Sequence, residues 1–175
     1  MEKSVTLLSL IKDSFDCEQQ DIRTYSPLAL AYIGDGIYEM IVRTVVVEHG
    51  NRSPQTLHKT VTKYVNAETQ CEIYEAILED LTEEELAIIK RGRNAKSYTT
   101  AKNASVQSYR KASGVEALFG YLYLTDNVPR AIELLKLGLE KTGRVLWKGA
   151  IHGLSGIYNR RKKCSNRSIS FRQTD

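Results

Sequence analysis

Apolar residues recur every three or four positions along most of the chain, and the alternation typical of strands is weak. This period predicts an all-α fold. Short polar or glycine-containing segments divide the pattern into separate helices. We expect these helices at residues 27–48, 54–63, 67–78, 83–93, 105–110, 113–125 and 128–139.

Three of the expected helices begin with recognisable start signals. Ser26 and Ser53 each precede a proline, and a serine N-cap followed by a first-turn proline favours helix initiation. Thr82 and Glu85 have the spacing of a capping box. In the first of these helices we expect one face to carry Leu28, Ala31, Tyr32, Asp35, Glu39 and Val42.

Length and composition fit one globular domain with tails. The chain has 175 residues, of which 42% are hydrophobic and 26% are charged. We expect an N-terminal arm over 1–23, a helical domain over 24–140, and a basic, partly disordered extension over 141–175. No apolar run reaches the ~20 residues that a transmembrane helix needs, so no membrane partner is expected.

The N-terminus and the cysteines bear on where the protein works. Residues 1–13 carry both signs of charge and no small-residue cleavage signal, which argues against secretion. Cys17, Cys71 and Cys164 are odd in number and far apart, so they form neither a disulfide framework nor a metal motif. We therefore expect a cytoplasmic protein.

The net charge of +4 hides an uneven distribution of charge. Residues 141–175 hold nine Lys or Arg and one acid, and residues 90–111 hold seven bases and no acid. Lys and Arg that neutralise phosphates supply most of the non-specific affinity of proteins for nucleic acids. The basic stretches indicate either a surface that binds a polyanion or an ordinary solvated surface, and composition leaves both open.

Two carboxylates stand out because their surroundings are apolar. Asp35 lies between Gly34 and Gly36 within a helix, although each glycine costs roughly 1 kcal/mol there relative to alanine. Glu116 lies in a comparable segment, with Gly120 one turn later. A buried acid needs a partner or a cation. Two alternatives follow. Each carboxylate is hydrogen-bonded to an arginine or a backbone N–H, or the two carboxylates converge on one divalent cation.

The second alternative has a defined chemistry. Carboxylate oxygens are preferred ligands of Mg²⁺, with Mn²⁺ as a substitute. An ion held by Asp35 and Glu116 would activate water and stabilise charge on a phosphodiester. Glu39, one turn after Asp35, is expected to form a salt bridge rather than to join the site.

Three motifs lie far apart along the chain: Gly34-Asp35-Gly36, the basic run Arg91-Gly-Arg-Asn-Ala-Lys96, and Glu116-Ala-Leu118. Together with residues 28–33, 57–59, 102–103, 106–110 and 119–124, they resemble the catalytic domain of the ribonuclease III family in its short Mini-ribonuclease III form. The resemblance covers residues 24–140. It implies the all-helical ribonuclease III endonuclease fold, with Asp35 and Glu116 as the catalytic and metal-binding residues.

The same resemblance implies an activity and partners. It implies a homodimer that cleaves double-stranded RNA with Mg²⁺ and matures the 23S ribosomal RNA precursor, with the pre-ribosome or a ribosomal protein as a further candidate partner. Leu28, Ala31 and Ser113 stand where longer family members carry additional acids, which implies fewer protein ligands and more water around the metal. The residues after 140 are too few for a double-stranded-RNA-binding domain, so we expect the catalytic domain to bind the duplex.

RNA contacts are expected from the basic stretch and the residues after it. A-form duplexes are recognised largely through phosphates and 2′-hydroxyls, which basic and amide side chains reach. The candidates are Arg91, Arg93, Asn94, Lys96, Lys102, Asn103, Gln107, Tyr109 and Arg110. A catalytically silent RNA-binding or ribosome-assembly protein on the same fold is the alternative, although the retained Asp35 and Glu116 argue against it.

Overall fold

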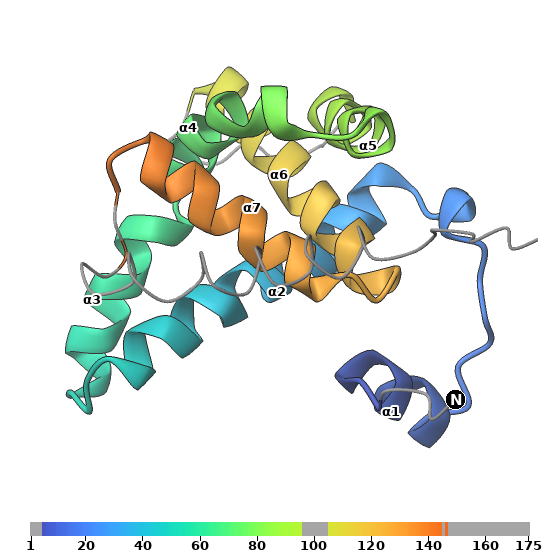
Figure 1. The fold of residues 1–175 in the computed structure, drawn as a ribbon, viewed down its shortest axis with the longest axis horizontal. Coiled ribbons are helices and arrows are strands. Elements are labelled where there is room, and N and C mark those ends of the chain that lie inside the picture. The colour runs from blue at the N-terminus through green and yellow to red at the C-terminus, as the bar shows by residue number, and fades with distance from the viewer. Residues whose placement is uncertain (1–4, 96–104, 145, 147–175) are drawn as a thin grey trace, which may run out of the picture.

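The computed structural model describes residues 5–95, 105–144 and 146. Within these residues all regular structure is helical, which confirms the predicted all-α fold (Figure 1). The α-helices are α1 (Leu7–Ser14), α2 (Pro27–Glu48), α3 (Pro54–Val65), α4 (Ala67–Ile77), α5 (Glu83–Asn94), α6 (Val106–Leu124) and α7 (Val128–Lys141). Short 3-10 turns precede α2 and α5, namely η1 (Ile22–Thr24) and η2 (Leu78–Asp80). None of the helices in the described ranges is long and apolar enough to cross a membrane.

The start signals predicted from the sequence are present as hydrogen bonds. The Ser26 hydroxyl accepts from the Ala29 N–H at 3.1 Å, and Pro27 opens α2. Thr82 and Glu85 form a reciprocal capping box at the start of α5. These bonds satisfy N–H groups that a helix N-terminus leaves without partners, so both helices begin where the local chemistry favours it.

Residues 106–124 form one continuous helix, α6. The prediction of a short helix to Arg110 and a second one from residue 113 was wrong, because Gly114 serves close packing instead of a break. A Cβ at Gly114 would lie 2.8 Å from the Ile89 carbonyl O, and a Cβ at Gly92 would lie 2.8 Å from the Ser113 carbonyl O. These glycines let α5 and α6 cross at close range without interrupting either helix.

The N-terminal arm contains a helix that the sequence pattern did not predict. Thr6 and Ser9 form a capping box at the start of α1. Leu8 is buried and packs with Ile37 and Tyr123. This small cluster attaches α1 to α2 and α6.

The central helix of the fold is α6, which packs against α2, α4 and α5 (Figure 1). The main core cluster draws large apolar side chains from several helices, including Tyr38, Ile73, Phe119 and Leu134. The rings of Tyr38 and Phe119 lie 5.2 Å apart between centroids. Because α6 is surrounded by other helices, a residue on it can be reached by side chains from several elements at once.

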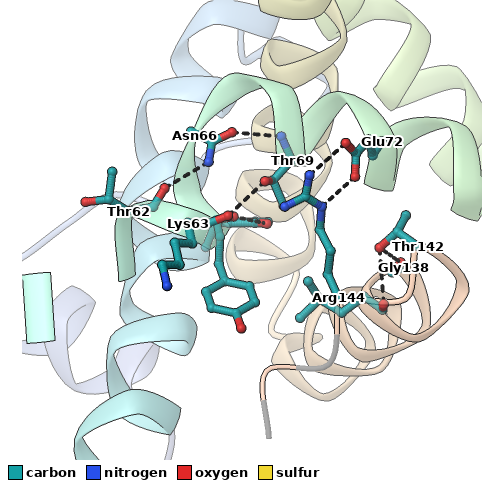
Figure 2. A network of polar contacts seen from close by, with 11 residues as sticks. Thr62, Lys63, Asn66, Thr69, Glu72, Gly138, Thr142 and Arg144 are labelled. Atoms are coloured by element: carbon teal, nitrogen blue, oxygen red, sulfur yellow. Dashed lines mark hydrogen bonds and ion pairs between the residues drawn. The ribbon is translucent and has the colours of Figure 1, made fainter. Parts of the chain in front are cut away.

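A network of polar contacts links the start of α4 to the end of α3 and to the segment after α7 (Figure 2). The Asn66 side chain accepts from the Thr69 N–H, and the Thr69 hydroxyl donates to the Lys63 carbonyl, both at 2.9 Å. One turn later, the Arg144 guanidinium pairs with the Glu72 carboxylate. These contacts hold the first turns of α4 between the ends of α3 and α7. Arg144 belongs to the predicted 141–175 extension, of which the structure describes only residues 141–144 and 146.

Candidate active site

Asp35 and Glu116 are brought together where α2 crosses α6. Gly34 of α2 and Gly120 of α6 are buried at this crossing. A Cβ at Gly34 would lie 1.7 Å from the Glu116 carbonyl O, and a Cβ at Gly120 would lie 2.0 Å from the Leu30 carbonyl O. No side chain fits at either position, so the two glycines set the spacing between the helices that carry the carboxylates.

Asp35 does not lie on the buried face of α2, which corrects the face predicted from the sequence. The residue is exposed, and Tyr32 of the predicted face is 87% exposed. The face that is buried consists of Leu30, Ala31, Gly34, Ile37, Tyr38 and Val42. The helix is turned because Gly34, and not Asp35, makes the close contact with α6. Asp35 therefore lies at the edge of the crossing, while Glu116 is half-buried.

The surroundings of both carboxylates disfavour their charged forms. Burial and then the charge of Asp35 raise the pKa of Glu116 to about 7, although the Gln70 amide acts in the opposite direction. The pKa of Asp35 is also raised, first by partial burial of its carboxyl group and then by the charge of Glu39. Groups whose pKa is shifted by burial together with a specific neighbour are frequent at functional sites.

The two carboxylates fit a hard divalent cation. A nearby cation stabilises the charged forms that burial and neighbouring negative charges disfavour. Mg²⁺ binds carboxylate oxygens and usually keeps several waters. No group of three or more His, Cys, Asp or Glu side chains converges in the described part of the chain. Asp35 and Glu116 are the two carboxylates that could ligate such an ion, with water completing its coordination shell.

Glu39 forms the salt bridge that the sequence predicted. Its Oε1 accepts from Nη2 of Arg43 at 2.6 Å, across one turn of α2. Glu39 still lies close enough to raise the pKa of Asp35. It borders the candidate site while its own charge is matched by Arg43.

Six of the nine predicted RNA-contacting residues lie where α5 ends and α6 begins: Arg91, Arg93, Asn94, Gln107, Tyr109 and Arg110. The other three lie outside the described residues: Lys96, Lys102 and Asn103. The end of α5 packs against α6 at Gly92 and Gly114, about two turns after α6 begins. The six residues therefore belong to two helices that pack against each other.

The predicted RNA-contacting side chains do not all face the same way as Glu116. Tyr109 lies seven residues before Glu116 and therefore on the same face of α6, since 3.6 residues make one turn. Gln107 lies nine residues before Glu116 and faces the opposite side of the helix. Arg91 reaches the start of α2, because its guanidinium donates to the Tyr25 carbonyl O at 3.4 Å.

One residue beside the carboxylates was not predicted from the sequence. Gln70 of α4 is 1% exposed, and its amide lowers the pKa of Glu116. A signal was present in the sequence, because Gln70 precedes Ile73 and Ile77 at helical spacing. A polar residue in such a buried stripe calls for an explanation.

Known proteins are similar in sequence to this domain. The Ribonuclease III domain family matches residues 28–127, which include both carboxylates. The chain is 48% identical to the Mini-ribonuclease 3 of Enterococcus faecalis over 126 residues, which cover 71% of this chain and 96% of that protein. It is 41% identical to the Mini-ribonuclease 3 of Thermoanaerobacter sp. over 140 residues, which cover 80% of this chain and 97% of that protein.

The fold is also shared with a solved structure. The crystal structure of protein FN1578 from Fusobacterium nucleatum has a TM-score of 0.63 and 34% sequence identity, and the match covers 70% of this chain and 94% of that one. The helical architecture and the sequence similarity over most of the chain agree with each other. The chain therefore belongs to the ribonuclease III family, with Mini-ribonuclease 3 proteins as its relatives, and it is an endoribonuclease.

Proposed function

We propose that this endoribonuclease cleaves double-stranded RNA with Mg²⁺ and that Asp35 and Glu116 hold the ion. The observation that carries the proposal is the convergence of these two carboxylates at a helix crossing that glycines hold at close range. A bound divalent cation supplies an activated water and stabilises charge that develops on a phosphodiester. The half-buried Glu116 and the exposed Asp35 leave one side of the pair open to an RNA strand.

The residues at the junction of α5 and α6 position the duplex. Arg91, Asn94 and Arg110 are exposed there and present donors suited to phosphates and 2′-hydroxyls. They lie on the helices that pack around the carboxylates, so a duplex bound to them passes close to the site. Their role is to bind and orient RNA, and the two carboxylates act at the scissile phosphate.

Two copies form a homodimer through the exposed face of α2. Exposed apolar side chains lie along this face at intervals of four, eight and seven residues, which are close to one or two helical turns: Leu28, Tyr32, Met40 and Val47. Gly36 lies in the middle of the stripe, and a Cβ there would meet no atom within 4 Å. Glycine in a helix interior is less stable than alanine, so its presence here supports the approach of a second molecule.

A shallow groove continues this face. It has a volume of about 430 Å³ and is lined by Gly36, Glu39, Met40, Arg43, Thr44, Val47 and Glu48. A two-fold axis through the face would place the α2 face of one copy, with its groove and exposed apolar side chains, against the same face of the other copy. The resulting dimer carries two carboxylate pairs, one for each strand of a duplex.

The natural substrate that we propose is the precursor of 23S ribosomal RNA, as the resemblance of the sequence motifs implies. The pre-ribosome or a ribosomal protein is then the natural partner. Within the described residues, Cys17 and Cys71 form no disulfide. We propose that the protein works in the cytoplasm, where thiols stay reduced.

The proposal is tested by incubating the purified protein with a long RNA duplex, with one of its strands alone, and with a fragment of the 23S precursor. Each reaction contains Mg²⁺, Mn²⁺ or EDTA. With either metal we expect cleavage of the long duplex and of the double-stranded part of the 23S precursor fragment. We expect no cleavage of the single strand, and no cleavage of any substrate in EDTA. Duplex binding without cleavage in Mg²⁺ would support the catalytically silent alternative, and cleavage in EDTA would contradict the metal site.

A further inference from the structure

Gln70 is a buried amide that the packing of the fold does not satisfy. Its side chain is 1% exposed, and Nε2 has no hydrogen-bond partner among the described residues. An unpaired buried donor carries the full desolvation cost of the group. Native structures retain few such groups, and each one calls for an explanation.

The carboxyl group that Gln70 influences is that of Glu116. The Gln70 amide faces the Glu116 carboxyl group closely enough to act on it as a hydrogen-bond donor does. The geometry falls short of a complete hydrogen bond, since Nε2 remains unpaired. Gln70 thus approaches Glu116 from the interior, where α4 packs against α6.

The turn of α4 that carries Gln70 is fixed on both sides (Figure 2). Before it, the buried Thr69 donates to the Lys63 carbonyl at 2.9 Å. After it, Glu72 pairs with Arg144. The Gln70 N–H itself donates to the Asn66 carbonyl at 3.1 Å. A backbone held this firmly presents its side chain in one direction, as a residue that supports a metal ligand must.

We propose that Gln70 is a positioning residue for Glu116. In the metal-bound protein, its unpaired amide N–H would donate to one carboxylate oxygen of Glu116 and leave the other oxygen for the cation that Asp35 would also bind. This inference rests on the proposed function, because it assumes that Glu116 is a metal ligand. Removal of groups that hydrogen-bond to metal ligands typically lowers metal affinity or activity by about 10–100-fold.

The test measures metal binding and stability in the full chain without RNA. Leucine is close to glutamine in size and has no donor, so Gln70→Leu should fold with a melting temperature that is unchanged or raised by about 2–4 °C. Its affinity for Mn²⁺, measured by electron paramagnetic resonance of the free ion, should fall about 10-fold or more. Gln55→Leu is the matched control, because Gln55 is exposed on α3, and it should keep the wild-type affinity.

A double-mutant cycle separates positioning from a structural role. If Gln70 acts through Glu116, Gln70→Leu should have no further effect on Mn²⁺ affinity in a Glu116→Gln background. An equal loss in both backgrounds would overturn the inference, as would wild-type affinity in folded Gln70→Leu and Gln70→Met proteins. Failure of both variants to fold would also overturn it, because the amide would then be structural. Absence of Mn²⁺ binding and of duplex cleavage in the wild type would instead refute the proposed function, and this inference with it.

Discussion

Gly34 lies so close to Glu116 that a Cβ at residue 34 would stand 1.7 Å from the Glu116 carbonyl O. The atom in the way belongs to the backbone of α6, so no side-chain rotation can make room. The spacing between α2 and α6 and the approach of Asp35 to Glu116 therefore have the same cause.

Replacement of Gly34 by alanine should damage both the fold and the site. We expect Gly34→Ala to lower the free energy of unfolding by about 1–3 kcal/mol or more, as overpacking does, although alanine is the better helix former. Urea denaturation measures this loss. Gly50→Ala is the control, because its Cβ meets only the flexible Arg52 side chain, at 3.2 Å. It should change stability by less than about 0.5 kcal/mol, and an equally small change in Gly34→Ala would contradict the close crossing.

The proposed dimer predicts the mass of the protein in solution. Sedimentation equilibrium at micromolar concentration should give nearly twice the 19.8 kDa of one chain. Met40→Lys puts a charge into the groove on α2 and should shift the protein to the monomer, because an unpaired charge is costly in an apolar interface. Ile132→Lys, at an exposed position on α7, should leave the mass unchanged. A wild-type protein that sediments as a monomer would contradict the proposed dimer.

The junction of α5 and α6 predicts the salt dependence of RNA binding. Arg91→Gln together with Arg93→Gln should weaken binding to duplex RNA and reduce the slope of log K against log salt. The expected reduction is roughly 0.7–0.9 for each phosphate that the variant no longer neutralises. The control variant, Arg52→Gln with Lys136→Gln, removes the same amount of charge outside α5 and α6. It should change the slope of log K against log salt less than the Arg91/Arg93 variant does. If the two double variants behave alike in a filter-binding titration, the RNA surface lies elsewhere.

Glu116 predicts a dependence of stability on pH in the presence of EDTA. Its pKa is raised from 4.5 to about 7 in the folded chain. Between these values the folded state keeps a proton that the unfolded state has released, so the free energy of unfolding falls as the pH rises. The loss contributed by Glu116 should be at most about 3 kcal/mol. Urea denaturation from pH 4.5 to 8 should show this fall in the free energy of unfolding in the wild type and not in Glu116→Gln. If the free energy of unfolding depends on pH equally in both proteins, the raised pKa of Glu116 is contradicted.

The local chemistry of the chain predicted most helix boundaries. Ser26, Ser53 and Thr82 cap the helices that they were expected to cap, since each bond is made within a few residues. The break expected near Gly114 was wrong, because a glycine that permits close packing has the same local signature as one that ends a helix. Only the position of α5 against α6 distinguishes the two.

The candidate site was predictable in its residues but not in its arrangement. Glycines beside Asp35 and Glu116 marked both carboxylates, but the sequence did not show that Gly34 would face α6 and leave Asp35 exposed. The contribution of Gln70 depends on how α4 packs against α6, which is a long-range contact. A buried polar residue in an apolar stripe marks such a position in the sequence, but only the folded structure identifies its partner.

The proposed function requires that Asp35 and Glu116 form one metal-dependent site for RNA cleavage. It is tested most directly by single-turnover cleavage of an RNA duplex at saturating Mg²⁺ by the wild type, Asp35→Asn, Glu116→Gln and the double variant. We expect each single variant to fold and to bind the duplex but to lose cleavage by roughly 10³-fold or more. We expect the double variant to lose little beyond that, because residues that act as a unit are strongly non-additive. A well-folded Asp35→Asn protein that cleaves the duplex at the wild-type rate would contradict the claim.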